Sequence, residues 1–379
     1  MEDKTLQMII KNYNQRDLAA RDWKKKGGKV VGYICNSVPE ELIMAAGMLP
    51  VRLTGTPGGE TKDIIEYFGV NAHCEGFVTT MLNDLITNRY DYLDYLIISR
   101  SRDTVATQYS RLCMLRDLDL GIKLPELYSY EFIQTWSHNS GEYTYERLLD
   151  LKARLEEWSE KSISNRLLKD AISTTNENRR FLQQIAALRM EGRISGMESL
   201  TITGSSYFMD KSEHNRLLNI FLKHANELPV KAGTKIFVAS SPLDSLQLYE
   251  IIESCGAIVV VEDHCWGNRC IDDMVDEIKD SMYAIAQRYH FKSPCPYVFF
   301  PENARLDYFA KKVKDTQPDG VIFYINENDA GQLWDYPDQY NMLVKNNIPA
   351  LSLLHQPYLI NNPDELKTKV KEFVQSLQA

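Results

Sequence analysis

The residues best suited to chemistry follow a hydrophobic stretch near the N-terminus. Residues 29–34 have the pattern of a strand that ends at Cys35, and Pro39 and Gly47 mark the start and end of the helix that follows. The turn between such a strand and helix is where α/β proteins bind ligands. Cys35 is therefore a candidate for redox or metal chemistry. The alternative interpretation is a small buried hydrophobic residue.

The other cysteines do not form a recognisable site by spacing alone. The chain has 7 cysteines, an odd number spread over 379 residues, which is not the pattern of a disulfide framework. Residues 263–270 bring a carboxylate, an imidazole, two thiols and an arginine into one loop, but without the paired spacing of a zinc site. The thiols are thus expected to be free in a reduced, cytoplasmic protein.

Composition and missing motifs exclude several classes of function. The net charge of -9 argues against a protein that binds nucleic acid by neutralising phosphates. No apolar run approaches the ~20 residues of a membrane span, and the charged N-terminus is unlike a secretory signal. The sequence contains neither a phosphate-binding P-loop nor the glycine-rich fingerprint of nicotinamide dehydrogenases. We therefore expect no nucleic-acid or membrane partner.

Alternating strand and helix patterns indicate an α/β fold of two lobes. Such alternation is typical of a parallel sheet covered by helices. The first lobe has an N-terminal helix over 4–25, then predicted strands at 29–34, 50–53 and 94–99 and helices at 39–47, 71–87 and 103–116. A helical segment covers 141–225. The second lobe has predicted strands at 235–240, 257–263, 320–325 and 348–354 and helices at 243–255, 271–289, 302–315, 331–345 and 363–377. The predicted domains are 1–140, 141–230 and 231–379.

The two lobes look like a degenerate internal repeat. Residues 32–53 have the same layout as residues 235–262, and the strand at 94–99 parallels that at 319–324. An Arg102-Asp103 pair follows one of these strands, and an Asn328-Asp329 pair follows the other. Because the pairs occupy equivalent strand ends, we expect both to face a common cleft.

The segment after Cys35 also carries a resemblance to a known family. Residues 38–53 read VPEELIMAAGMLPVRL. This stretch resembles the opening signature of the 2-hydroxyacyl-CoA dehydratase and benzoyl-CoA reductase family, which includes the double-cubane-cluster reductases. The resemblance extends from about Gly32 to the C-terminus. It implies two flavodoxin-like lobes joined by a helical segment, with the active site between the lobes.

The resemblance implies an iron–sulfur cluster, for which this chain keeps few ligands. Cys74 matches one cysteine ligand of the family, but Arg102 and Asn328 stand where two others are expected. A [4Fe–4S] cluster normally needs three or four thiolates. One hypothesis is that Cys35, used by double-cubane members, joins Cys74 and either Cys265 or Cys295. The other is that this chain holds no cluster, or an unusual one.

Four positions acquire candidate roles in binding or catalysis from the resemblance. In place of a cysteine, the Arg102 guanidinium is suited to bind a carboxylate, a thioester oxygen or a phosphate, as is Asn328 at the equivalent position. The alternative for Arg102 is a surface pair with Asp103. Ser37 and Glu40 border the implied substrate pocket and are the catalytic candidates, although a helix N-terminus alone explains a glutamate at position 40.

The resemblance implies a subunit of an oxygen-sensitive heterodimeric lyase that acts on CoA thioesters. Such enzymes receive one electron from an ATP-hydrolysing iron–sulfur activator, and the resulting ketyl radical eliminates the hydroxyl of a 2-hydroxyacyl-CoA. The implied partners are a larger homologous subunit, that activator and the CoA-thioester substrate. The alternatives are a structural subunit without a cluster, a benzoyl-CoA-type ring reductase subunit and a double-cubane-cluster reductase.

Overall fold

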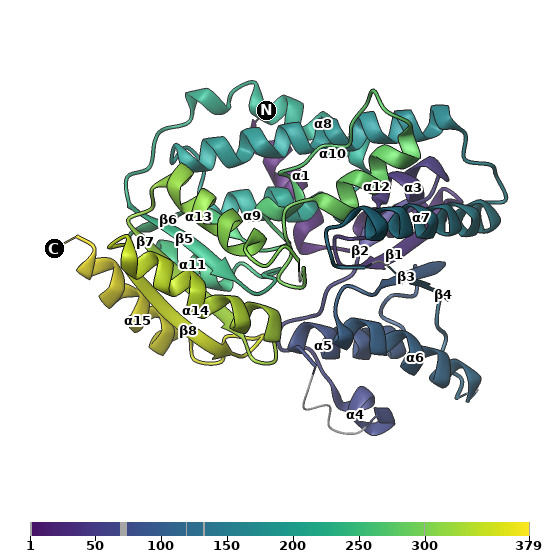
Figure 1. Cartoon of the computed structure of the whole chain (residues 1–379), viewed down its shortest axis with the longest axis horizontal. Helices are drawn as coiled ribbons and strands as arrows, with labels where there is room; N and C mark the ends of the chain where they lie inside the picture. Colours follow the sequence, from purple (N-terminus) through teal and green to yellow (C-terminus); the bar gives the residue numbers. More distant parts are fainter. Residues whose placement is uncertain (1, 69–73, 119, 132, 299, 379) are drawn as a thin grey trace.

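Two four-stranded parallel sheets form the two lobes of the molecule (Figure 1). The computed structural model describes residues 2–68, 74–118, 120–131, 133–298 and 300–378. The first sheet has the order β2-β1-β3-β4, and the second has the order β6-β5-β7-β8. This strand order is the one that flavodoxin-like folds share, and the predicted fold class is confirmed. The strands are β1 (Val30–Ile34), β2 (Leu49–Arg52), β3 (Tyr95–Ser99), β4 (Glu126–Tyr130), β5 (Thr234–Ser240), β6 (Ala257–Asp263), β7 (Gly320–Asn326) and β8 (Ala350–Gln356).

The helices of the first lobe follow the predicted alternation with three differences, one of which is the additional helix α4 at Lys62–Phe68. The N-terminal region forms two helices rather than one, because the chain turns between Asn14 and Leu18. Of the helix predicted at 71–87, residues 71–73 lie outside the described residues, and residues 74 and 75 are not helical, so the helix begins at Gly76. The helices are α1 (Glu2–Asn14), α2 (Leu18–Lys25), α3 (Glu40–Ala45), α4 (Lys62–Phe68), α5 (Gly76–Ile86) and α6 (Asp103–Asp117).

The helical segment lies across both lobes. It comprises α7 (His138–Ser159), α8 (Asn165–Met190), α9 (Gly196–Ser205) and α10 (Lys211–Leu222). The long helix α8 packs against α3 of the first lobe and β6 of the second, and it spans the top of the molecule in Figure 1. Because one helix contacts both lobes, this segment braces the lobes as well as connecting them.

In the second lobe, the largest difference from the prediction is the late start of one helix. Its helices are α11 (Gln247–Ser254), α12 (Ser281–Phe291), α13 (Ala304–Thr316), α14 (Ala330–Lys345) and α15 (Pro363–Ser376). The helix predicted at 271–289 begins only at Ser281, because the Asn176 side chain bonds both backbone groups of Val275, its amide to the carbonyl (2.7 Å) and its carbonyl to the N–H (3.0 Å). A side chain of α8 thus binds the backbone of the segment that was predicted to form the first turns of this helix.

The internal repeat is present in the backbone. The first strand of each lobe starts at a backbone N–H that donates to an aspartate preceding the third strand. Val30 N donates to Asp94 Oδ2 and Lys235 N donates to Asp319 Oδ2, both at 2.7 Å. The equivalent strands β1 and β5 therefore begin in the same way, and their carboxyl ends occupy equivalent positions.

Hydrophobic packing joins the lobes at one side of the first sheet. Alternate residues of β1 face two different cores. Val31 and Tyr33 pack with α3, α7 and α12, whereas Val30 and Ile34 belong to a core that continues into the second lobe through Trp266.

None of the helices in the described part of the chain is both long and apolar enough to cross a membrane.

Candidate functional site

A small cavity lies between the lobes at the carboxyl ends of β1 and β3. These two strands are neighbours from which the chain departs in opposite directions, and ligands of doubly wound α/β proteins bind at such a switch point. We call this hollow the switch-point cavity. Its lining includes Ile34, Cys35, Arg52, Ser101 and Arg102 from the first lobe and Pro242, Asp244, Cys265 and Trp266 from the second.

Cys35 occupies a strained position in this cavity. Its φ of 69° is in the left-handed region, which non-glycine residues adopt rarely. Burial by itself raises the pKa of the Cys35 thiol, but the positive charges of Arg52, Lys292 and Arg102 lower it to about 7. The neighbouring Cys265 is different, since burial raises the pKa of its thiol to about 11. Of these two thiols, Cys35 is the one that becomes a thiolate near neutral pH.

Arg52 connects the two lobes across the cavity. Its guanidinium donates to the Cys265 carbonyl oxygen (2.7 Å) and to Cys265 Sγ (2.9 Å). The guanidinium carbon also lies 4.2 Å from the ring centroid of Trp266, a cation–π contact. This buried cation of β2 therefore holds the loop that follows β6, and it has thiols and aromatic rings as its neighbours.

Arg102 forms a buried ion pair and not the surface pair with Asp103. Its NH1 atom lies 2.6 Å from Glu75 Oε1, and both side chains are buried. Arg102 also stacks over Tyr297 at 4.6 Å, and the Tyr297 hydroxyl donates to Asp329 Oδ1 at 3.2 Å. The expectation of a solvated Arg102–Asp103 pair is wrong because the residue precedes α6 at the lobe interface and its side chain turns inward.

The structure brings Cys74 and Asn328 together, away from the switch-point cavity. The Asn328 amide donates to the Cys74 carbonyl oxygen at 3.5 Å, and both residues line a hollow at the surface between the lobes. Cys74 Sγ accepts from the amide of Gln108 at 3.5 Å, and burial raises the pKa of this thiol. Asn328, which follows β7 of the second lobe, thus lies beside the backbone of Cys74, which precedes α5 of the first.

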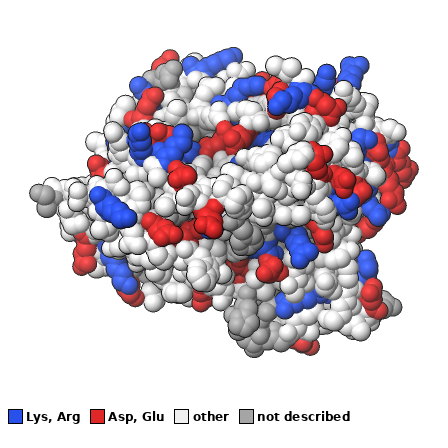
Figure 2. All heavy atoms as spheres, in the orientation of Figure 1, with Lys and Arg blue, Asp and Glu red and all other residues white. Residues whose placement is uncertain are grey.

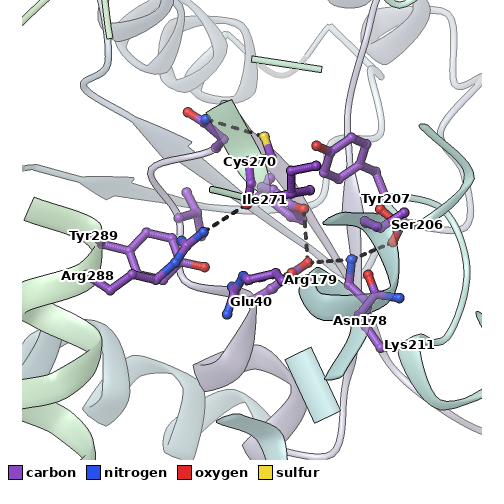
Figure 3. A pocket seen from close by; sticks show the side chains of 14 residues that line it. Glu40, Asn178, Arg179, Ser206, Tyr207, Lys211, Cys270, Ile271, Arg288 and Tyr289 are labelled. Carbon is purple, nitrogen blue, oxygen red and sulfur yellow. Dashed lines mark hydrogen bonds and ion pairs between the residues drawn. The ribbon is translucent and has the colours of Figure 1, made fainter. Parts of the chain in front are cut away.

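Ser37 and Glu40 face two other cavities. Ser37 is buried and lines a cavity with Lys292 and Cys295. Glu40 forms an ion pair with Lys211 Nζ at 3.1 Å in a polar pocket between α3, α8 and α10 (Figure 3). The two catalytic candidates are therefore not brought to one point. Glu40 has a structural explanation in its Lys211 partner.

The thiols do not fit a [4Fe–4S] cluster. Within the described ranges, no group of three or more Cys, His, Asp or Glu side chains is placed to hold a metal ion. Cys35, Cys74 and Cys295 line three different cavities. The Arg102–Glu75 ion pair fills the position where the resemblance expects a cluster thiolate. The expected metal ligands Cys35 and Cys74 thus line different cavities, and the described residues offer no complete coordination sphere for a metal.

Several residues of the site are not singled out by the sequence. Arg52 belongs to the PVRL end of the motif at residues 38–53. The sequence therefore drew attention to this position but indicated no role for the side chain. Lys292 and Glu75 carried none, because each reaches the site from a distant loop or helix start. Ser101 lies next to Arg102 and could have been found from its place after β3.

The fold and the site together define a two-lobed α/β protein whose candidate site lies between flavodoxin-like lobes. Residues 35–377 match the model of one family, described as 2-hydroxyglutaryl-CoA dehydratase, D-component, and the chain belongs to this family.

Its relatives include components of several CoA-thioester enzymes. The chain is 23% identical to the (R)-phenyllactyl-CoA dehydratase beta subunit of Clostridium sporogenes, over 96% of each chain. It is 23% identical to the beta subunit of (R)-2-hydroxyglutaryl-CoA dehydratase from Acidaminococcus fermentans, over 94% of each. A subunit of benzoyl-CoA reductase from Thauera aromatica is 24% identical over 88% of each chain.

Proposed function

We propose that this chain is the smaller, β-type subunit of a cytoplasmic complex that dehydrates a 2-hydroxyacyl-CoA to a 2-enoyl-CoA. In this proposal the iron–sulfur centre lies in a larger homologous subunit, and a separate ATP-hydrolysing iron–sulfur activator supplies one electron. The support is the family and the full-length similarity to dehydratase beta subunits. The ketyl radical mechanism is proposed from the family resemblance alone. We propose no role in its steps for residues of this chain.

The Arg102–Glu75 ion pair is the observation that supports the proposal of a cluster in the larger subunit and not in this chain. A buried guanidinium and carboxylate at 2.6 Å occupy the equivalent of a cluster-ligand position. Because an arginine paired with a carboxylate stands here, this position lacks the thiolate that a cluster needs. The chain then contributes the walls of the cleft, while the redox chemistry belongs to its partner.

The test is reconstitution from separate components. The chain, the larger subunit and the activator are purified without oxygen and combined with ATP, Mg²⁺, a one-electron reductant and a panel of 2-hydroxyacyl-CoA thioesters. The proposal predicts enoyl-CoA formation only when this chain and the larger subunit are both present. Enoyl-CoA formation that is undiminished when this chain is left out would contradict it.

A ring reductase subunit is the second candidate, because the identity to a benzoyl-CoA reductase subunit, 24% over 88% of each chain, is close to the identity to the dehydratase subunits. Adding benzoyl-CoA to the same panel distinguishes the two activities. Reduction of the ring, without dehydration of any 2-hydroxyacyl-CoA, would favour the second candidate.

A further inference from the structure

A groove at the β2 edge of the first sheet has the size of a ligand site. We call it the β2 groove, and it is lined by residues 14–17 and 51–57, together with Asp84, Arg89, Tyr90, Tyr92 and Phe208. Its free space amounts to about 410 Å³. Pockets that bind small molecules measure roughly 300–1,000 Å³. The groove is therefore large enough for a substrate or for part of one.

The β2 groove lies directly outside the switch-point cavity. Arg52, Leu53 and Thr54 line both of them. Arg16 lines the groove, Asp244 lines the cavity, and these two side chains form an ion pair at 3.2 Å. The cavity has only about 20 Å³ of free space, too little for an acyl thioester. The groove thus ends at a partition between the lobes, with the smaller cavity behind it.

The exposure of the lining residues gives the groove an outer and an inner end. The Arg89 side chain is 61% exposed, whereas Arg52 is 3% exposed. Asn14 is exposed like Arg89, and Leu53 and Phe208 are buried like Arg52. Arg89 therefore marks the outer end of the groove, and Arg52 marks the inner end beside the partition.

The acidic side chains that line the groove are each paired with an arginine. The ion pairs in and beside the groove are Arg21–Asp17 (2.6 Å), Arg89–Asp84 (3.3 Å) and Arg16–Asp244 (3.2 Å). The walls also present the rings of Tyr90, Tyr92 and Phe208. Paired charges and aromatic rings suit the uncharged part of a ligand, one that combines amides and hydroxyls with apolar groups.

Arg89 differs from the paired interior because part of its guanidinium is available. Its contacts to Asp84 Oδ1 and Thr56 Oγ1, both at 3.3 Å, are made by Nη1. Within the described ranges, Nε and Nη2 of this exposed side chain have no protein acceptor. A guanidinium with two neighbouring N–H groups to offer binds a phosphate in a bidentate manner.

We propose that the β2 groove binds the pantetheine arm of a CoA thioester, with the phosphates of the nucleotide end at Arg89. Coenzyme A has this order of parts, since phosphates at one end continue into a neutral arm of amides, a hydroxyl and methyl groups that ends at the sulfur. The thioester end then points to the partition beside Arg52. This inference rests on the proposed function, which makes the substrate a CoA thioester.

The experiment measures the binding of free CoA to the full-length chain by isothermal titration calorimetry. The Arg89→Gln variant should raise the Kd at least about tenfold, because a bidentate contact to phosphate is lost. Asn14→Trp places a large ring at the mouth of the groove and should weaken binding by a similar factor. Asn14 is exposed at the end of α1, so this second variant leaves the core intact.

Each variant has a matched control outside the groove. Arg116→Gln changes another exposed arginine, and Lys11→Trp places a tryptophan at an exposed position of α1 that does not line the groove. Both controls should bind CoA like the wild type. A wild-type chain that does not bind CoA, or one Kd shared by the wild type and both groove variants, would overturn the proposal.

Activity of the reconstituted complex separates this inference from the proposed function. If the complex dehydrates no thioester while CoA binding still depends on Arg89 and Asn14, the proposed function fails and the groove assignment is supported. If the complex is active, both groove variants should raise the KM for the 2-hydroxyacyl-CoA with little change in kcat. An active complex whose KM is the same in both groove variants as in the wild type would overturn the groove assignment alone.

Discussion

At the residue scale, the Arg102–Glu75 pair decides how the site is interpreted. The pair replaces a sulfur position by two opposite charges that are buried together. Tyr297 covers the guanidinium and connects it to Asp329 at the equivalent strand end of the second lobe. The two strand ends are thus joined by one stacking contact and one hydrogen bond, both made by Tyr297.

This arrangement predicts that Arg102 and Glu75 stabilise the fold only as a pair. Arg102→Ala leaves a buried, uncompensated carboxylate and should lower the free energy of unfolding by about 3–5 kcal/mol. The double variant Arg102→Ala/Glu75→Gln should recover part of this loss. Urea unfolding measures the free energy of unfolding of the single variant and of the double variant. Arg116→Ala is the control for an exposed arginine and should cost less than about 1 kcal/mol. A loss of the same small size for Arg102→Ala would contradict the buried pair.

At the element scale, α8 holds the two lobes in place through two buried ion pairs, one to each lobe. Arg179 lies 2.6 Å from Glu41 of α3, and Arg189 is paired with Glu262 of β6. Glu41 also accepts from the Tyr289 hydroxyl at 2.8 Å. One helix thereby fixes the start of α3, next to Cys35, relative to the second lobe.

The α8 pair predicts a loss of stability in acid. Burial by itself raises the pKa of Glu41, but Arg179 and Arg288 lower it to about 2, below its usual value near 4.5. The stabilisation is therefore complete above pH 4.5 and is lost as the pH falls from there towards 2. Unfolding free energies measured across this range should fall more steeply in the wild type than in Glu41→Gln. Equal slopes would contradict the assigned pKa.

The elements that the sequence could predict are those with continuous apolar runs. β1, β5, β6 and β7 are buried on both faces and are visible as such runs. β4 was missed because its sequence ELYSY is short, polar at alternate positions and at the sheet edge. The late start of α12 could not be foreseen either, since Asn176, on a distant helix, holds the preceding segment.

The candidate site was less predictable than the fold because its contacts are long-range. The sequence placed Cys35 and Arg102 at strand ends, and the flavodoxin-like order then brings them to one cavity. It could not show that Glu75 neutralises Arg102, or that Ser37 and Glu40 face separate cavities. These outcomes depend on side-chain directions and on the packing of the two lobes.

At the scale of the whole molecule, the lobes meet through Asp244 beside the switch-point cavity. The Tyr358 hydroxyl donates to its carboxylate at 2.8 Å, the Tyr13 hydroxyl donates to its carbonyl oxygen at 2.8 Å, and Arg16 completes the cluster with an ion pair at 3.2 Å.

The face drawn in Figure 2 mixes acidic and basic side chains without a large patch of one sign.

The most direct test of the account is the iron and acid-labile sulfide content of the chain. The chain is purified without oxygen, both alone and in complex with the larger subunit. We predict less than about one iron per isolated chain, with the iron of the complex carried by the partner. About four irons and four sulfides per isolated chain, the content of one [4Fe–4S] cluster, would contradict the account.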